Sequence, residues 1–163
     1  MLHTNATSKE SYAHRFAKEQ LCAWLRKAAQ HAGPDEYAHF CGLSWRVNRG
    51  APHYGVWPEY PLQCKQDTVW DEIDDKWLER PPTRDEAIAA RMPPDFILDI
   101  AIQHKGAITI GIEIVHKNRF SPTKVILLNR AFWPFSLFEI PAAWVLGQVD
   151  CPTDGIPDEF LVF

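Results

Sequence analysis

Apolar and polar positions alternate with a helical period near the start of the chain. Apolar side chains, Leu21 and Leu25 among them, form a stripe in a segment rich in strong helix formers. Thr7 with Glu10 three residues later is a capping box, and His31 followed by a Gly-Pro pair is typical of a helix end. The pattern predicts a long amphipathic helix between these signals.

A second pattern covers residues 95–117, where two isoleucine-rich runs flank the polar tripeptide His104–Gly106. Each run carries one carboxylate, Asp99 in the first and Glu113 in the second. Strand side chains alternate in direction, so the length of the turn decides which faces the carboxylates share. A two-residue turn would put them on opposite faces. A three-residue loop, with Gly106 at the left-handed position, puts them on one face and every isoleucine on the other, and we predict this register.

The remaining segments predict a mixed sheet. Residues 35–80 read as an irregular, Trp-rich insertion, in which 37–47 is a candidate strand. Capping and proline signals predict further elements along the chain, namely a short helix after Thr83, a helix from Ser121, a strand over 134–140, a helix from Pro141 and a terminal strand. We therefore expect one α/β domain over residues 1–163, with a central β-hairpin in a mixed β-sheet flanked by helices.

Composition narrows the function. The net charge is -4 and the isoelectric point is near 5.9. That balance argues against a protein that binds DNA through charge alone, but it allows an enzyme with an acidic metal site. No apolar run is long enough for a membrane span, and the first residues lack the apolar core of a signal peptide. The four cysteines form no C-x-x-C pair, so we expect free thiols and a cytoplasmic location.

The two carboxylates of the hairpin suggest metal chemistry. Like charges on one face raise each other's pKa unless a cation lies between them. Hard divalent ions such as Mg²⁺ are held by one or two carboxylates together with substrate phosphates. The alternative is a solvated outer face without a metal site, because half-exposed antiparallel strands ordinarily carry polar residues on that face.

Three short motifs resemble a known group of enzymes. They are "IEIVHKN" at 112–118, "LD" at 98–99 and "ESYAHRFAKEQL" at the start of the first helix. Together they resemble the PD-(D/E)xK nuclease superfamily, and within it the competence protein CoiA-like group. The resemblance covers residues 8–29 and 93–140.

The resemblance implies a restriction-endonuclease-like core and a Mg²⁺- or Mn²⁺-dependent hydrolase that cleaves DNA. Asp99 and Glu113 would be the catalytic metal ligands. Glu10, His14 and Lys18 match an E…H…K pattern on the opening helix. Glu10 would then be an additional metal ligand. The substrate contacts would be His14, Lys18 and His116.

Two positions depart from the pattern of the superfamily. The lysine of the (D/E)-x-K element would fall at Val115. Lys117, Lys124 or Lys18 would have to supply that charge, and without one of them the protein would be a catalytically inactive nuclease-fold module that binds nucleic acid or a protein partner. The first acid also has an alternative, Asp95 in "MPPDF".

The irregular insertion holds a second set of metal-ligating side chains, His39, Cys41, His53 and Cys64. Their spacing matches no standard zinc pattern, so a zinc site there is the less favoured prediction. The oligomeric state and the DNA sequence or structure preference do not follow from these residues.

Overall fold

A computed structural model describes residues 11–33, 36–62, 67–71, 75–80, 96–115 and 135–163 of the chain. Its long helix, α2 (Tyr12–Gln30), confirms the apolar stripe at helical spacing, because Leu21 and Leu25 are fully buried. The N-cap of α2 is Ser11, whose hydroxyl accepts a hydrogen bond from the backbone N–H of His14 at 3.1 Å. The predicted capping box of Thr7 and Glu10 lies outside the described residues.

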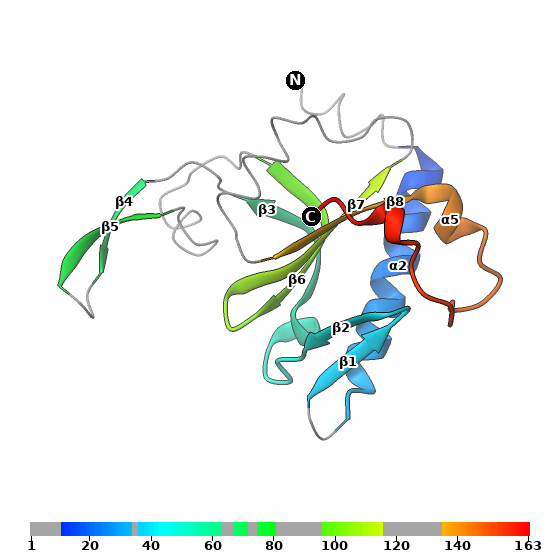
Figure 1. Ribbon diagram of the computed structural model, residues 1–163, viewed down its shortest axis with the longest axis horizontal. Coiled ribbons are helices and arrows are strands. Elements are labelled where there is room, and N and C mark those ends of the chain that lie inside the picture. The colour runs from blue at the N-terminus through cyan, green and yellow to red at the C-terminus, as the bar shows by residue number, and fades with distance from the viewer. Residues whose placement is uncertain (1–10, 34–35, 63–66, 72–74, 81–95, 116–134) are drawn as a thin grey trace.

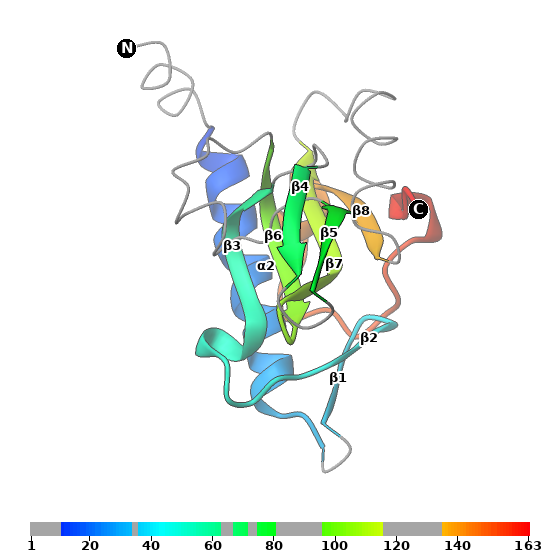
Figure 2. The ribbon, with the colours of Figure 1, turned by 90° about the vertical axis from the view of Figure 1, so that its left-hand side faces the viewer.

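The central sheet has four strands in the order β3-β6-β7-β8. Strand β6 (Phe96–His104) pairs antiparallel with both β3 (Val56–Leu62) and β7 (Ala107–Val115), whereas β8 (Ser136–Pro141) runs parallel to β7. Figures 1 and 2 show the hairpin of β6 and β7 at the centre of this sheet, with α2 along one side. The predicted α/β class, mixed sheet and central hairpin are therefore confirmed.

The insertion region is more regular than its sequence suggests. The predicted strand over 37–47 is a hairpin of two short strands, β1 (Tyr37–Phe40) and β2 (Leu43–Arg46). The chain reverses because Cys41 and Gly42 both have positive φ, 47° and 81°, as tight hairpin turns require. A 3-10 turn, η1 (Pro52–Gly55), then leads into β3.

Strands β4 (Asp67–Asp71) and β5 (Lys76–Arg80) form a separate antiparallel hairpin, which projects from the rest of the protein in Figure 1. The predicted strand over 134–140 is β8, and the predicted helix after it is α5 (Ala142–Leu146) with Pro141 as N-cap. A last 3-10 turn, η2 (Asp158–Phe160), precedes a bridge from Leu161 to Phe138. The helices predicted after Thr83 and from Ser121 lie outside the described residues.

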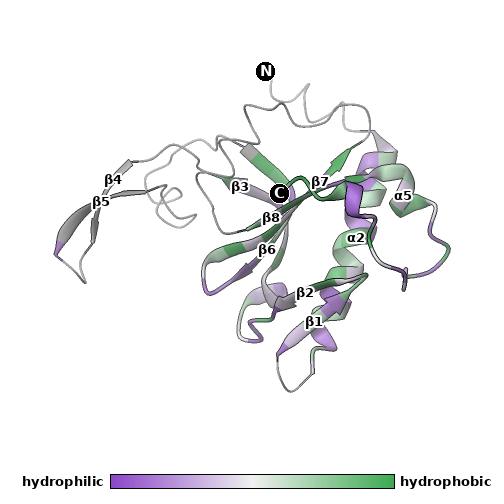
Figure 3. Ribbon diagram, in the orientation of Figure 1, coloured by the Kyte–Doolittle hydropathy of each residue, from purple (hydrophilic) through white to green (hydrophobic). Residues whose placement is uncertain are grey.

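Apolar side chains bury both faces of the central sheet, and Figure 3 shows the apolar colour concentrated on its strands. One cluster joins α2, β1, β2 and α5 to the sheet through five isoleucines of the hairpin (Ile100, Ile102, Ile110, Ile112 and Ile114). The other cluster includes Leu98, Ala101, Ile108 and Leu137. The second face is thus a core face, not the solvated surface that the polar positions suggested. None of the described helices has the length and apolar character needed to cross a bilayer.

The hairpin turn is shorter than predicted, and one isoleucine lies on the other face of the sheet as a result. His104 pairs with Ala107, so the turn has two residues, Lys105 and Gly106, with φ of 50° and 82°. A β-bulge then adds one residue, because Gln103 pairs with Ile108 whereas Ile102 pairs with Ile110. Ile108 therefore falls in the second cluster, and the prediction that all isoleucines share one face is wrong.

Candidate functional site

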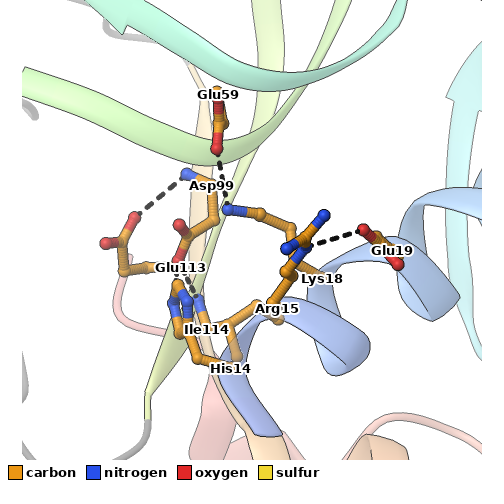
Figure 4. Close-up of polar contacts among 8 residues, drawn as sticks. All are labelled: His14, Arg15, Lys18, Glu19, Glu59, Asp99, Glu113 and Ile114. Carbon is orange, nitrogen blue, oxygen red and sulfur yellow. Dashed lines mark hydrogen bonds and ion pairs between the residues drawn. The ribbon is translucent and has the colours of Figure 1, made fainter. Parts of the chain in front are cut away.

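The two carboxylates of the hairpin meet where the backbone ladder between β6 and β7 ends. The last pair in the described register is Ile100 with Ile112. Beyond it, the backbone N–H of Asp99 donates to Glu113 Oε2 at 3.3 Å. The backbone N–H of Ile114 donates to Asp99 Oδ2 at 2.8 Å. Side-chain carboxylates thus take the place of backbone carbonyls as acceptors, and Asp99 and Glu113 lie close together, as predicted (Figure 4). Asp99 faces α2, however, on the same side of the sheet as most isoleucines of the hairpin, so the prediction that the carboxylates lie on the face opposite the isoleucines is wrong for Asp99.

This proximity has a different origin from the predicted one. The three-residue loop would have placed Glu113 diagonally across from Asp99. In the structure the bulge shifts the register by one residue, and continuing it past Ile100 sets Asp99 opposite Glu113. The face of the sheet beside Gly111 is also filled. A Cβ there would lie 3.0 Å from Leu98 Cδ1 and 3.1 Å from Phe135 Cε2, so apolar side chains fill it.

Helix α2 brings two more polar side chains to the carboxylates. His14 Nε2 lies 3.1 Å from Asp99 Oδ2. One turn later, Lys18 is only 6 % exposed, and its Nζ donates to Glu59 Oε1 of β3 at 3.0 Å. Figure 4 shows these side chains converging on Asp99 from α2, β3 and the hairpin.

Asp99 is the electrostatic centre of this group. Burial raises the pKa of its carboxyl above the ordinary value. The Ile114 N–H and the neighbouring His14 and Lys18 oppose that rise, because each favours the charged form. Burial outweighs them, so Asp99 holds a proton more readily than an exposed aspartate does.

The raised pKa of Asp99 predicts how stability depends on pH. The folded chain holds the proton of Asp99 more tightly than the unfolded chain does. Protonated Asp99 therefore contributes its full stabilisation of the fold below the ordinary pKa of 3.8, and this stabilisation is lost as pH rises through the pKa of the folded chain. In metal-free buffer we expect Asp99→Asn to raise the free energy of unfolding by about 1 kcal/mol at neutral pH, and by less in acid. Urea unfolding of both proteins across this pH range measures the difference. An equal difference in unfolding free energy between the two proteins at every pH would contradict the raised pKa of Asp99.

The structure brings together four of the predicted site residues, Asp99, Glu113, His14 and Lys18. Sequence reasoning missed Glu59, which follows a proline in the insertion and has a positive φ of 49°. Nothing in its local sequence marks it as a partner of Lys18. Val115 lies at the end of β7, where it pairs with Pro141. The other predicted site residues lie outside the described part of the chain, namely Glu10, Asp95, His116, Lys117 and Lys124.

The donor set at Asp99 and Glu113 suits a hard divalent cation in part. Both are carboxylates, and the hydrogen bonds that Asp99 receives from described residues fall on Oδ2. A cation beside a buried carboxylate would also favour its charged form. Within the described ranges, no group of three His, Cys, Asp or Glu side chains is placed to hold a metal ion. The third ligand predicted from sequence, Glu10, is not among the described residues.

The residues of the predicted zinc site do not all gather at one place. His39 and Cys41 line a pocket beside the β1–β2 turn, and the pKa of the Cys41 thiol is raised to about 11, first by burial and then by nearby Cys151 and Asp154. The ring of His53 instead packs edge-on against Trp57, with centroids 5.4 Å apart. Cys64 lies outside the described residues, and the zinc site stays a prediction.

Comparison with known proteins finds no counterpart for this chain: no family model, no curated protein and no solved structure matches it. The interpretation of the site therefore depends on its own geometry and on the motifs of the sequence.

Proposed function

We propose that this protein is a metal-dependent nuclease that hydrolyses phosphodiester bonds of DNA. One observation carries the proposal: two carboxylates on adjacent strands, Asp99 and Glu113, meet a buried lysine and a histidine from α2 at a break in the sheet ladder. The two hairpin carboxylates are the metal ligands that the resemblance to the PD-(D/E)xK superfamily implies, whereas the lysine comes from α2 and not from the position that Val115 occupies. Such a set supplies both anionic ligands for a cation and a positive charge for a phosphate.

Asp99 and Glu113 would hold Mg²⁺ or Mn²⁺, with Glu10 as the proposed additional ligand. Such an ion, when bound, would activate water and neutralise charge on the phosphodiester. The protein holds its two carboxylates in place through backbone donors, since Ile114 N–H fixes Asp99 and Asp99 N–H fixes Glu113.

Lys18 is the described residue best placed to replace the lysine missing at Val115. It is buried, and it lies close enough to Asp99 to lower the pKa of that carboxyl. An ammonium group has three N–H donors, so it can hold Glu59 and also donate to a phosphate oxygen. Lys117 and Lys124 remain the alternatives for this charge.

His14 would act mainly by positioning Asp99. Its Nε2 points at Asp99 Oδ2, so this nitrogen is directed toward the carboxylate. A direct contact between His14 and DNA stays part of the proposal, as does the contact predicted for His116. A single nitrogen held at 3.1 Å from the acid restricts the rotation of both side chains.

Cleavage assays on single-stranded, duplex and branched DNA with Mg²⁺ or Mn²⁺ test the proposed function. Glu113→Gln removes one anionic ligand with little change of shape, so we expect cleavage to fall by about 100-fold or more. Glu159→Gln, an exposed position on η2, is the matched control and should retain full activity. Absence of cleavage on every substrate, or unchanged cleavage by Glu113→Gln, would contradict the proposal.

The alternative function is a catalytically inactive nuclease-fold module that binds nucleic acid or a protein partner. The observation that favours it is Val115 at the position expected for lysine, together with the net charge of -4. Calorimetric titration with Mn²⁺ separates the two, because the nuclease proposal requires heat of binding that Glu113→Gln removes. DNA binding without Mn²⁺ binding would support the inactive module.

A further inference from the structure

A pair of thiols lies at the opposite end of α2 from the carboxylates. Cys41 is in the β1–β2 turn and is 8 % exposed, whereas Cys151 is exposed on the segment after α5. Cys41 Sγ donates to the Pro152 carbonyl oxygen at 3.1 Å, and Cys151 Sγ lies 4.0 Å from the same oxygen. The two sulfurs are therefore at most about 7 Å apart, although the two cysteines are far apart in the sequence.

The backbone around these thiols is held in place. The Ile156 N–H donates to the Cys41 carbonyl oxygen at 2.8 Å, so the C-terminal segment is fixed against the turn next to Cys41. Cys41 itself has a φ of 47°, in the left-handed region where Asn or Gly is usual. A non-glycine residue in this region carries backbone strain, and strain of this kind is frequent at functional positions.

Both cysteines line one pocket. The pocket has a volume of about 520 Å³, and its lining includes Cys41, Cys151, Trp24 and His31. A small reagent in this pocket would therefore lie next to both cysteines. In the described residues the third free thiol, Cys22, is buried on α2 and does not line this pocket.

We propose that Cys41 and Cys151 are a modification site, at which a low-molecular-weight disulfide such as oxidised glutathione converts the two thiols into an intramolecular disulfide. The exposed Cys151, as thiolate, attacks one glutathione sulfur, and the S–S bond breaks to release one glutathione thiolate. Cys41 then loses its proton and attacks Cys151 Sγ, which releases the second glutathione. Two protein thiols are oxidised and one glutathione disulfide is reduced to two thiols.

The bond would tie the β1–β2 hairpin to the C-terminal segment. It closes a loop that contains most of the chain, and long loops gain the most from closure because the unfolded chain loses the most freedom. The site is separate from the proposed nuclease site. His14 and His31 are about 25 Å apart along a helix that rises 1.5 Å per residue, so the test does not depend on DNA cleavage.

The chain of 163 residues, reduced and kept in EDTA, tests the proposal when it is titrated with oxidised glutathione. We expect a loss of two hydrogens in the intact mass, a Cys41–Cys151 cross-linked peptide after digestion, and a rise in melting temperature of about 5 °C or more that dithiothreitol reverses. Cys41→Ser and Cys151→Ser should each abolish all three changes.

Cys22→Ser is the matched control and should leave the cross-link intact, because its side chain lies outside the pocket. The same titration in urea should give little of this cross-link, since only the folded chain brings the two sulfurs together. Glutathione adducts on Cys151 without an internal bond would overturn the proposal. So would a cross-link from either cysteine to Cys64.

Discussion

Lys18→Met is expected to lower the rate of DNA cleavage by about 100-fold or more, because the substitution removes a buried ammonium group that lies close enough to Asp99 to lower the pKa of its carboxyl. Methionine keeps the length of the side chain but removes its charge and its donors to Glu59 and to a phosphate. The measurement is the single-turnover rate of cleavage with Mn²⁺. The loss should appear in that rate more than in the binding of DNA.

The substitution should also change how Mn²⁺ binding depends on pH. The charge of Lys18 lowers the pKa of Asp99, so its removal raises that pKa further, and a higher pH is then needed to ionise the acid and bind the cation. Titration calorimetry with Mn²⁺ at several pH values measures this shift, and it does not require activity.

Arg15→Met is the matched control for Lys18→Met. Arg15 lies on the same helix but pairs with Glu19 at 3.3 Å on the exposed side, where its side chain is 63 % exposed. An exposed pair of this kind contributes little to stability. Its loss should leave both the cleavage rate and the pH dependence of Mn²⁺ binding unchanged. Full activity of Lys18→Met would instead assign the missing charge to Lys117 or Lys124.

Gly55→Ala is expected to lower the free energy of unfolding by about 3 kcal/mol or more. Gly55 has a φ of 81°, and a Cβ at this position would overlap the backbone carbonyl oxygen of Gln103 on β6. A backbone atom in a central strand cannot rotate away as a side chain does. The clash would push η1 away from β6 at the point where β3 begins.

Gly106→Ala separates the effect of the clash from that of backbone conformation. Gly106 has nearly the same φ, 82°, but a Cβ added there would have no described atom within 4 Å beyond its chain neighbours. Only the left-handed strain then applies, about 1 kcal/mol. Urea unfolding of the two variants gives the comparison. Equal losses of stability would contradict the close approach of Gly55 to β6.

Local sequence pattern was sufficient for much of the fold. The apolar stripe of α2 and the isoleucine runs of the hairpin were predicted because both depend on periodicities of a few residues. The same holds for β8 and α5, which are marked by a proline between them. The strands of the insertion were harder to see, because several of them are short and prolines interrupt the apolar pattern.

The candidate site needed more than pattern. The helical spacing of His14 and Lys18 predicted a shared face, but their partners Asp99 and Glu59 are 85 and 41 residues away in sequence. Periodicity carries no information about which distant strand a helix will face. Glu59 in particular has no signal of its own, and it joins the site because β3 pairs with β6.

The hairpin shows where local pattern stops being informative. The sequence has one carboxylate on each strand at a similar distance from the turn, so their closeness follows from any register near that of a simple hairpin. Alternation along the first strand predicted the wrong face for Asp99, which lies toward α2. The turn and the bulge set the actual register. Because β7 has one extra residue at the bulge, its side chains on the turn side of the bulge point to the opposite face from that which simple alternation predicts. That choice moved Ile108 into the second core cluster and set Asp99 opposite Glu113. The two apolar clusters beside the hairpin join residues that are far apart in the chain, so local pattern does not contain the information that decides this register.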